Sequence, residues 1–143
     1  SLDLVASRKP KMVIDPGWAA GAGLTFSPAV RAGHHVFLSG TTAFDFRTRS
    51  VHSPGDIAGQ ALFVYEQLDE LIRLAGGHGL ADLVKTIEYV APAATERYRD
   101  VGPVRQQVLG RPLPAATGVL VGSLLQPDWL IEVDALAVID VAD

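Results

Sequence analysis

The sequence predicts an α+β fold in which two helices pack on one face of a mixed β-sheet. Segments with strand-like composition enclose two helical segments, in the order strands, helix, strand, helix, strands. The 143 residues suit a single domain spanning 1–143, and the contents of 48% hydrophobic and 20% charged residues are typical of globular proteins. The chain is therefore long enough to bury its own core.

The N-terminal part predicts three short strands. KMVID (11–15) is the first, and residues 26–33 and 34–40 form two more, joined by a turn near Arg31-Ala32-Gly33. The glycine-rich segment 16–24 lacks the spacing of a phosphate-binding loop, so we expect an ordinary loop there. The polar segment 41–55 is also expected to be a loop.

A helix is expected over residues 56–77, because its apolar residues recur at three- and four-residue steps. Asp56 is a plausible N-cap, and Gly76 and Gly77 supply the left-handed stop. The apolar stripe consists of Ile57, Ala61, Val64, Leu68, Leu71 and Ala75.

The C-terminal half predicts a strand at 83–91, a helix at 95–109 that Gly102-Pro103 kinks or breaks, and a final pair of strands. The last two strands are expected at 117–125 and 129–140, joined by a turn at 126–128. The consecutive apolar residues 119–121 make both faces of one strand apolar, whereas two helices cover only one face. We therefore expect the second face to be buried against other subunits.

Several classes of function are excluded or disfavoured. Without cysteine there is no disulfide, thiolate nucleophile or cysteine-bound metal, and the four histidines show no HxH or HxxxH spacing, so no metal site is expected. Ser39 lies in FLSGT rather than GxSxG. A net charge of −4 with scattered basic residues disfavours nucleic acid, and no apolar run is long enough for a membrane span or a secretory signal, so we expect a cytoplasmic protein.

Two carboxylates stand out in LIEVDALAVI (130–139). Glu132 and Asp134 are two residues apart in an apolar strand and therefore share one face of the pleat. They are compatible with a salt-bridged pair at a subunit contact. They are equally compatible with a carboxylate that holds water in a cleft, where desolvation raises its pKa toward the range useful for general base catalysis.

The chain resembles a known family over roughly residues 24–139, which leaves 1–23 as an N-terminal extension. LTFSPAVRAGHHVFLSGTT, GQALFVYEQLDELIRLAGG, ADLVKTIEYV, LPAATGVLVGSLL and LIEVDALAV follow the order and spacing of the Rid superfamily. These are the YjgF-type reactive-intermediate deaminases, also called endoribonuclease L-PSP. The resemblance implies a chorismate-mutase-like homotrimer that binds a small-molecule substrate in clefts between subunits. It also implies hydrolysis of imines or enamines to ketones and ammonia, without a metal or organic cofactor.

The resemblance also implies roles for individual residues. Glu132 takes the position of the catalytic glutamate that orients the attacking water. Phe26 stands where the family has a tyrosine, and Ala116 stands where it has the arginine that grips a substrate carboxylate. The positions expected to contact substrate are Phe26, Ser39, Gly40, Thr41, Ala116, Thr117 and Gly118.

The missing arginine bears on the substrate. An arginine fork binds a carboxylate through two charged hydrogen bonds, and alanine offers no donor. Arg31, Arg97 and Arg105 are candidate replacements, but the sequence places none of them in the cleft. We therefore expect a substrate that is neutral, larger or more apolar than an amino-acid-derived imine, with Trp18 suited to contact it.

The leading hypothesis is a divergent Rid-type hydrolase acting on an imine, an enamine or a related C–N intermediate. The alternative is a non-catalytic small-molecule-binding trimer of the same fold, favoured by the loss of the arginine and of the tyrosine hydroxyl. A mutase or lyase is a third hypothesis, although the aligned pocket lacks the cations that would hold a dicarboxylate. A ribonuclease is the weakest, because the chain is acidic and lacks a catalytic histidine pair.

Overall fold

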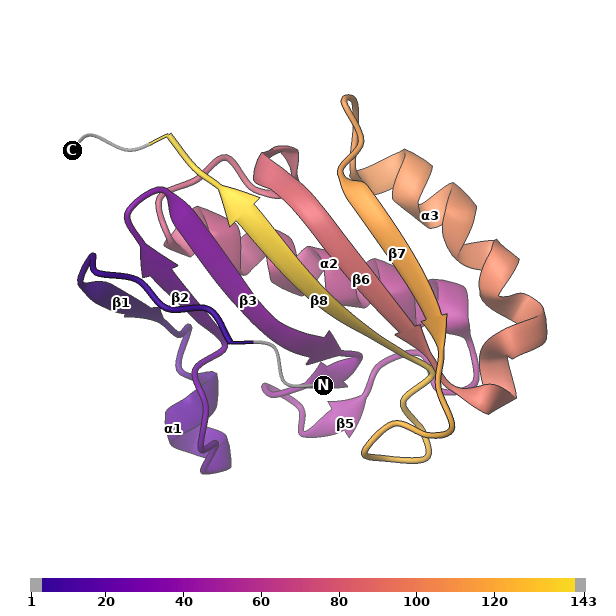
Figure 1. Ribbon diagram of the computed structural model, residues 1–143. Helices are drawn as coiled ribbons and strands as arrows, with labels where there is room; N and C mark the ends of the chain where they lie inside the picture. Colours follow the sequence, from indigo (N-terminus) through magenta and orange to yellow (C-terminus); the bar gives the residue numbers. More distant parts are fainter. Residues whose placement is uncertain (1–3, 141–143) are drawn as a thin grey trace.

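The computed structural model describes residues 4–140, so the ends of the expected domain, 1–3 and 141–143, lie outside the described residues. Its centre is a six-stranded sheet in the order β1-β2-β3-β8-β6-β7 (Figure 1). The strands are β1 (Lys11–Ile14), β2 (Ala29–Ala32), β3 (His35–Thr42), β6 (Leu83–Val90), β7 (Ala115–Leu120) and β8 (Ile131–Val138). The expected mixed sheet of an α+β fold is confirmed.

The last strand lies in the middle of the sheet. β8 pairs antiparallel with both β3 and β6, whereas β7 pairs parallel with β6 at the sheet edge. The expectation that the last two strands form a pair joined by a short turn is therefore wrong. β8 alternates buried and more exposed residues from Ile131 to Val138. The buried residues therefore point to the face of the sheet that the helices cover.

Helices α2 (Ile57–Leu74) and α3 (Val101–Val108) lie on the same face of the sheet (Figure 1). The predicted stripe of α2 is buried, including Ala61, Val64 and Leu68 at 0% exposure. Asp56 precedes α2 but makes no capping hydrogen bond through its side chain. Gly76 has φ 99°, and this left-handed residue follows the end of the helix as expected.

The helix predicted over 95–109 is instead two segments, a 3₁₀ segment η2 (Pro92–Asp100) followed by α3. The change falls before Gly102-Pro103 rather than at it. Pro103 lies in the first turn of α3, where its missing N–H costs no intrahelical hydrogen bond. A second short 3₁₀ segment, η1 (Leu80–Asp82), leads into β6.

Two segments expected to be loops contain regular structure. Residues 41–55 include the small hairpin β4 (Phe44–Asp45) and β5 (Ser50–Val51), and the glycine-rich segment holds a short helix, α1 (Trp18–Ala22). The turn between β2 and β3 is Gly33-His34, so Arg31 and Ala32 belong to β2. The residues before position 24 therefore supply β1, paired to β2, and the buried Trp18.

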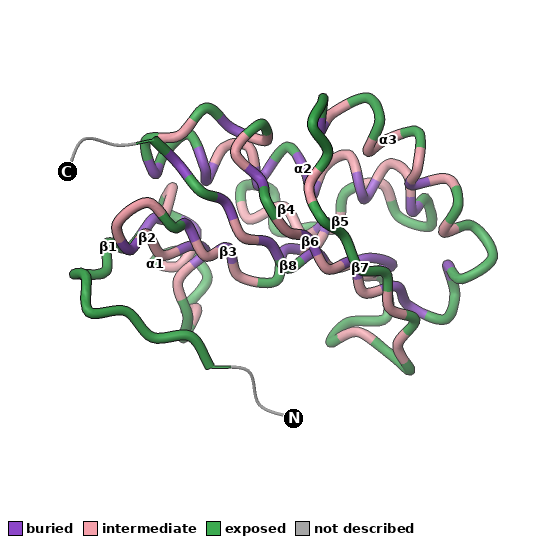
Figure 2. Tube along the Cα trace, turned by 45° about the horizontal axis from the view of Figure 1, so that its top comes forward, coloured by how far each residue is buried: buried purple, intermediate pink, exposed green. Residues whose placement is uncertain are grey.

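Within residues 4–140, no helix covers the face of the sheet opposite α2 and α3. β7 is mostly exposed along its length, as the burial-coloured trace shows (Figure 2). Apolar side chains occur on this open face, among them Val138 at 41% exposure and the half-buried Ile87 and Leu136. The open face is thus apolar on β6 and β8, whereas Val121 of the predicted two-faced strand lies beyond the end of β7.

A buried carboxylate lies between the sheet and the helices. Glu88 of β6 is 1% exposed and accepts hydrogen bonds from the hydroxyls of Tyr65 (3.0 Å) and Tyr98 (2.9 Å). Arg105 of α3 forms an ion pair with it, at 3.2 Å from Nε to Oε1. Burial, and then the nearby Glu88 charge, raises the pKa of Tyr98 to about 12. The four side chains tie β6, α2, η2 and α3 together.

We expect Arg105→Met to lower the free energy of unfolding by about 2–3 kcal/mol, because removing one partner of a buried pair leaves the other charge poorly compensated. The matched control is Arg97→Met. Arg97 pairs with Asp100 at 2.6 Å but its side chain is 73% exposed, so its loss should cost less than about 1 kcal/mol. Urea unfolding measures both. Equal losses would show that the Glu88 cluster contributes no more than a surface ion pair.

Candidate functional site

A cavity of about 740 Å³ opens at one end of the sheet, where the end of β3 meets the start of β8. Its walls come from α1, the loop 24–28, the β4–β5 hairpin and the loop 125–129. Volumes of this size are typical of small-molecule sites. Four separate segments therefore converge beside the ends of β3 and β8 to enclose the cavity.

A β-bulge shapes the floor of the cavity. The register between β3 and β8 runs from Leu38 opposite Ala135 to Thr41 opposite Val133, so β3 has one extra residue at Ser39-Gly40. A Cβ placed on Gly40 would collide with Glu132 Oε1 and lie 3.1 Å from its Cδ. Glycine at this position lets the Glu132 carboxylate lie directly against the β3 backbone.

Glu132 is the acidic group of this floor. Its side chain is partly buried, and burial raises its pKa above the ordinary value, with the nearby charge of Asp134 adding to the rise. Within residues 4–140, no hydrogen bond or ion pair holds the Glu132 carboxylate. A carboxylate whose pKa is raised in this way binds a proton more readily than an ordinary glutamate does, as a general base must.

Two buried amides of α2 hold the segments around the cavity. Gln60, 0% exposed, donates from Nε2 to the backbone oxygen of Asp128 (3.0 Å) and accepts at Oε1 from the N–H of Leu130 (2.9 Å). Gln67, seven residues further, donates to the backbone oxygen of Thr42 (2.8 Å). The sequence analysis missed both, although amides two turns apart on an apolar helix face are a recognisable signal.

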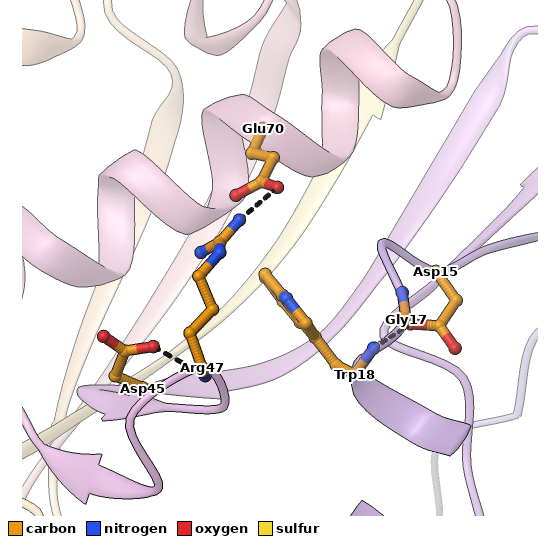
Figure 3. A network of polar contacts seen from close by, with 6 residues as sticks. All are labelled: Asp15, Gly17, Trp18, Asp45, Arg47 and Glu70. Carbon is orange, nitrogen blue, oxygen red and sulfur yellow. Dashed lines mark hydrogen bonds and ion pairs between the residues drawn. The ribbon is translucent and has the colours of Figure 1, made fainter. Parts of the chain in front are cut away.

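An aromatic wall faces this floor. Trp18 stacks on Phe46 with ring centroids 5.3 Å apart, and Phe46 meets Phe44 edge-on at 5.1 Å. Figure 3 shows the Trp18 ring pointing from α1 toward the segment that carries Arg47. The wall is thus built jointly by α1 and the β4–β5 hairpin.

Polar contacts fix both halves of the wall. Asp15 Oδ1 accepts from the N–H groups of Gly17 (2.9 Å) and Trp18 (2.7 Å), which sets the start of α1 (Figure 3). Arg47 donates from its side chain to Glu70 Oε1 of α2 (2.7 Å) and from its backbone N–H to Asp45 Oδ1 (2.8 Å). The hairpin is therefore tied to the long helix.

The structure brings five of the predicted site residues together around the cavity: Phe26, Ser39, Gly40, Thr41 and Glu132. The hydroxyls are already engaged within the chain, since Ser39 donates to the backbone oxygen of Ser27 (2.6 Å) and Thr41 donates to that of Ser39 (2.9 Å). Their backbone atoms and the Thr41 methyl group remain as lining.

The other three predicted residues, Ala116, Thr117 and Gly118, lie on β7, with β6 and β8 between them and β3. Thr117 accepts a hydrogen bond from Lys85 Nζ (2.8 Å). A Cβ on Gly118 would lie 2.7 Å from the Tyr98 hydroxyl, so this glycine makes room for the Glu88 cluster. Within one chain these residues do not meet the cavity.

Three aromatic residues of the cavity, Phe44, Phe46 and Trp129, were not predicted from the sequence as site residues. The first two were assigned to a loop, although the alternation in FDF is a short-strand signal. Trp129 enters the cavity because Gln60 holds the loop 126–130, and that contact spans 70 residues of sequence. No local pattern predicts it.

None of the three arginines considered as replacements lines the cavity. Arg31 donates to the backbone oxygens of Gly33 and Ala75, Arg97 pairs with Asp100, and Arg105 pairs with Glu88. No lysine, arginine or histidine is among the lining residues that the structure describes.

Residues 4–140 contain no group of three or more histidine, aspartate or glutamate side chains arranged to hold a metal ion. Over the same residues, no helix combines the length and the apolar character needed to cross a bilayer.

Known proteins share this architecture. The family described as Endoribonuclease L-PSP matches residues 19–139. A RutC family protein of Pyrococcus horikoshii is 30% identical over 112 residues, covering 78% of this chain and 85% of that relative.

Solved structures agree. A member of the YjgF/YER057c/UK114 family from Mycobacterium tuberculosis is 31% identical with a TM-score of 0.74, covering 91% of this chain and 100% of that one. RidA from the Antarctic bacterium Psychrobacter sp. is 27% identical with a TM-score of 0.79, covering 90% and 99%.

The raised pKa of Glu132 predicts a pH-dependent effect on stability. Folding favours its protonated form, so this contribution is fully present below the ordinary pKa of 4.5 and is lost as pH rises through the folded value. Glu132→Gln should therefore raise the free energy of unfolding at pH 7.5, by roughly 0.2–1 kcal/mol, the range for partly exposed charges. At pH 4 the gain should vanish.

Urea unfolding at the two pH values measures this effect. Glu96→Gln is the matched control, because Glu96 is exposed on η2. Its replacement should change stability by less than about 0.5 kcal/mol at either pH. A Glu132→Gln variant that is less stable than the wild type at pH 7.5 would mean that the native carboxylate is stabilised rather than strained.

Proposed function

The chain belongs to the endoribonuclease L-PSP family, the YjgF-type Rid superfamily, and we propose that it is a divergent Rid-type hydrolase acting on an imine, an enamine or a related C–N intermediate. Membership supports a function in processing small molecules. The observation that carries the proposal is the position of Glu132, a carboxylate of raised pKa with no partner within the described residues, on the floor of a cavity.

The proposed chemistry uses Glu132 as a single acid–base group. Its carboxylate takes a proton from water as the water oxygen bonds to the imine carbon, and the C=N π electrons move to nitrogen. The carboxylic acid then returns the proton to nitrogen, which gives a carbinolamine. The carboxylate next takes the hydroxyl proton and passes it to the amino nitrogen, so that ammonia leaves with the C–N electron pair as the C=O bond forms. Water and imine thus give a carbonyl compound and ammonia.

The substrate is proposed to lack the carboxylate of an amino-acid-derived imine. The arginine that the family resemblance implies is Ala116 here, and no cationic side chain lines the cavity within residues 4–140. A bound carboxylate would meet Glu132 and Asp128 instead, and like charges in a partly desolvated site repel.

A homotrimer is part of the same proposal. The open sheet face carries apolar side chains such as Ile87 and Leu136 that no element of the described chain covers. The predicted substrate-contacting residues of β7 lie away from the cavity of their own chain. Association through the open faces would cover these apolar side chains. It would also let β7 of one copy approach the cavity of the next.

The alternative, a non-catalytic small-molecule-binding trimer, rests on two residues. Phe26 carries no hydroxyl, and Ala116 carries no charge, at the positions where the resemblance implies polar groups. In that case the cavity would bind its ligand and Glu132 would hold no reacting water.

Imine hydrolysis distinguishes the two functions. An amine oxidase generates a carboxylate-free imine in the assay, and an amino-acid oxidase generates the matching α-imino acid. Semicarbazide then traps the imine that has not been hydrolysed. We expect the protein to accelerate hydrolysis of the first imine and to have little effect on the second. Glu132→Gln should reduce the acceleration by about 10²–10⁴, the usual contribution of a general base.

Gly40→Ala is a second variant for the same assay. It keeps the carboxylate but displaces it from β3, and Gly40 has no positive φ that alanine would strain. It should therefore fold and lose most of the acceleration. A Glu132→Gln variant as active as the wild type would overturn the role of Glu132, and no acceleration of any imine would favour the binding function.

The oligomeric state tests the trimer. Light scattering after gel filtration should give three times the mass of one chain. Ile87→Glu, on the open face, should give single chains, since burying an unpaired charge in an apolar interface is costly. Leu74→Glu, at the end of α2 and 52% exposed, is the control and should stay trimeric. A wild-type protein that runs as a single chain would contradict this part of the proposal.

A further inference from the structure

We propose that the cavity selects a protonated imine, an iminium cation, carried on a flat aromatic or similarly large apolar group. This inference rests on the proposed function for its chemistry and adds the charge and shape of the substrate. The apolar group lies among the aromatic side chains, and the C=N end lies at Glu132. The reaction balances, because an iminium ion and water give a carbonyl compound and an ammonium ion.

The shape of the cavity supports a large apolar group. At about 740 Å³ it is far larger than a two- or three-carbon imine requires. Its lining includes five aromatic residues: Trp18, Phe26, Phe44, Phe46 and Trp129. Aromatic rings at such positions favour flat ligands through stacked or edge-on contacts.

The charges around the cavity support a cation. Glu132 and Asp128 are its charged lining residues within the described part of the chain, and both are acidic. Aromatic faces attract a cation within about 6 Å, most strongly those of tryptophan. A bound iminium would also offset the desolvation that Glu132 experiences, and it is more easily attacked by water than a neutral imine.

A second copy of the chain would not reverse this preference. If β7 of a neighbour approached the cavity, it would bring with it Lys85 of the adjacent β6 and, from α3 on the helix-covered face, Arg105. Arg105 is neutralised by the buried Glu88, and Lys85 donates to the Thr117 hydroxyl. Arg105 is therefore committed to its own chain, and Lys85 is held beside the Thr117 hydroxyl rather than aimed at Glu132.

Three isosteric probes test the inference: benzamidinium, benzamide and benzoate share a ring and a planar head group but differ in charge. Both tryptophans of the chain, Trp18 and Trp129, line the cavity, so intrinsic fluorescence reports its occupancy. We expect benzamidinium to bind at least about tenfold more tightly than benzamide. Benzoate should bind more weakly than either.

Variants assign the two halves of the site. Glu132→Gln should bring the affinities for benzamidinium and benzamide within about threefold of each other, while Glu96→Gln leaves their ratio unchanged. Trp18→Ala should lower the affinities for benzamidinium and benzamide by a similar factor, with the fluorescence of Trp129 as the readout. Phe46→Leu gives the same test if Trp18→Ala fails to fold.

The outcomes separate this inference from the proposed function. Benzoate binding as tightly as benzamidinium, no binding of any probe at millimolar concentration, or a charge preference that survives Glu132→Gln would overturn the selectivity. If carboxylate-free imines are hydrolysed without such a preference, the hydrolase stands and the inference fails. If the preference is found but no imine is hydrolysed, the charge selectivity stands and the hydrolase fails.

Discussion

The central position of β8 is the constraint on which the rest of the structure depends. A strand with neighbours on both sides has its backbone groups paired, so Glu132 is held rigidly between β3 and β6. The extra residue in β3 at Ser39-Gly40 then places a side-chain-free backbone directly beside that carboxylate. Sheet pairing and the bulge together make a partly buried acid that nothing else in the described chain neutralises.

Helix α2 performs two tasks with one face. Its apolar stripe fills the core, while Gln60 and Gln67 on the same buried face bond to the backbone of the loop 126–130 and of the end of β3. A buried amide is tolerated only when its hydrogen bonds are made. The cost of burying these amides is offset by bonds that fix two walls of the cavity, so the site is coupled to the core.

The sequence predicted what depends on local pattern and missed what depends on long-range contact. The stripe of α2 and the strands around Val36 and Val133 follow from periodicity, and the family resemblance identified Glu132. Trp129 reaches the cavity only through a contact 70 residues away in sequence. The pairing of β7 with β6 instead of β8 likewise depends on where η2 and α3 pack, which no turn residue encodes.

The strand that carries Ala116 shows why the loss of one arginine need not have been repaired by another. Its neighbour Gly118 lies over Tyr98, whose hydroxyl bonds to Glu88, and Arg105 completes that cluster. Moving Arg105 toward a ligand would leave Glu88 without its cation in a buried setting, a costly exchange. The fold therefore holds Arg105 in place, and a site left with acids and aromatic rings is better matched to a cation than to an anion.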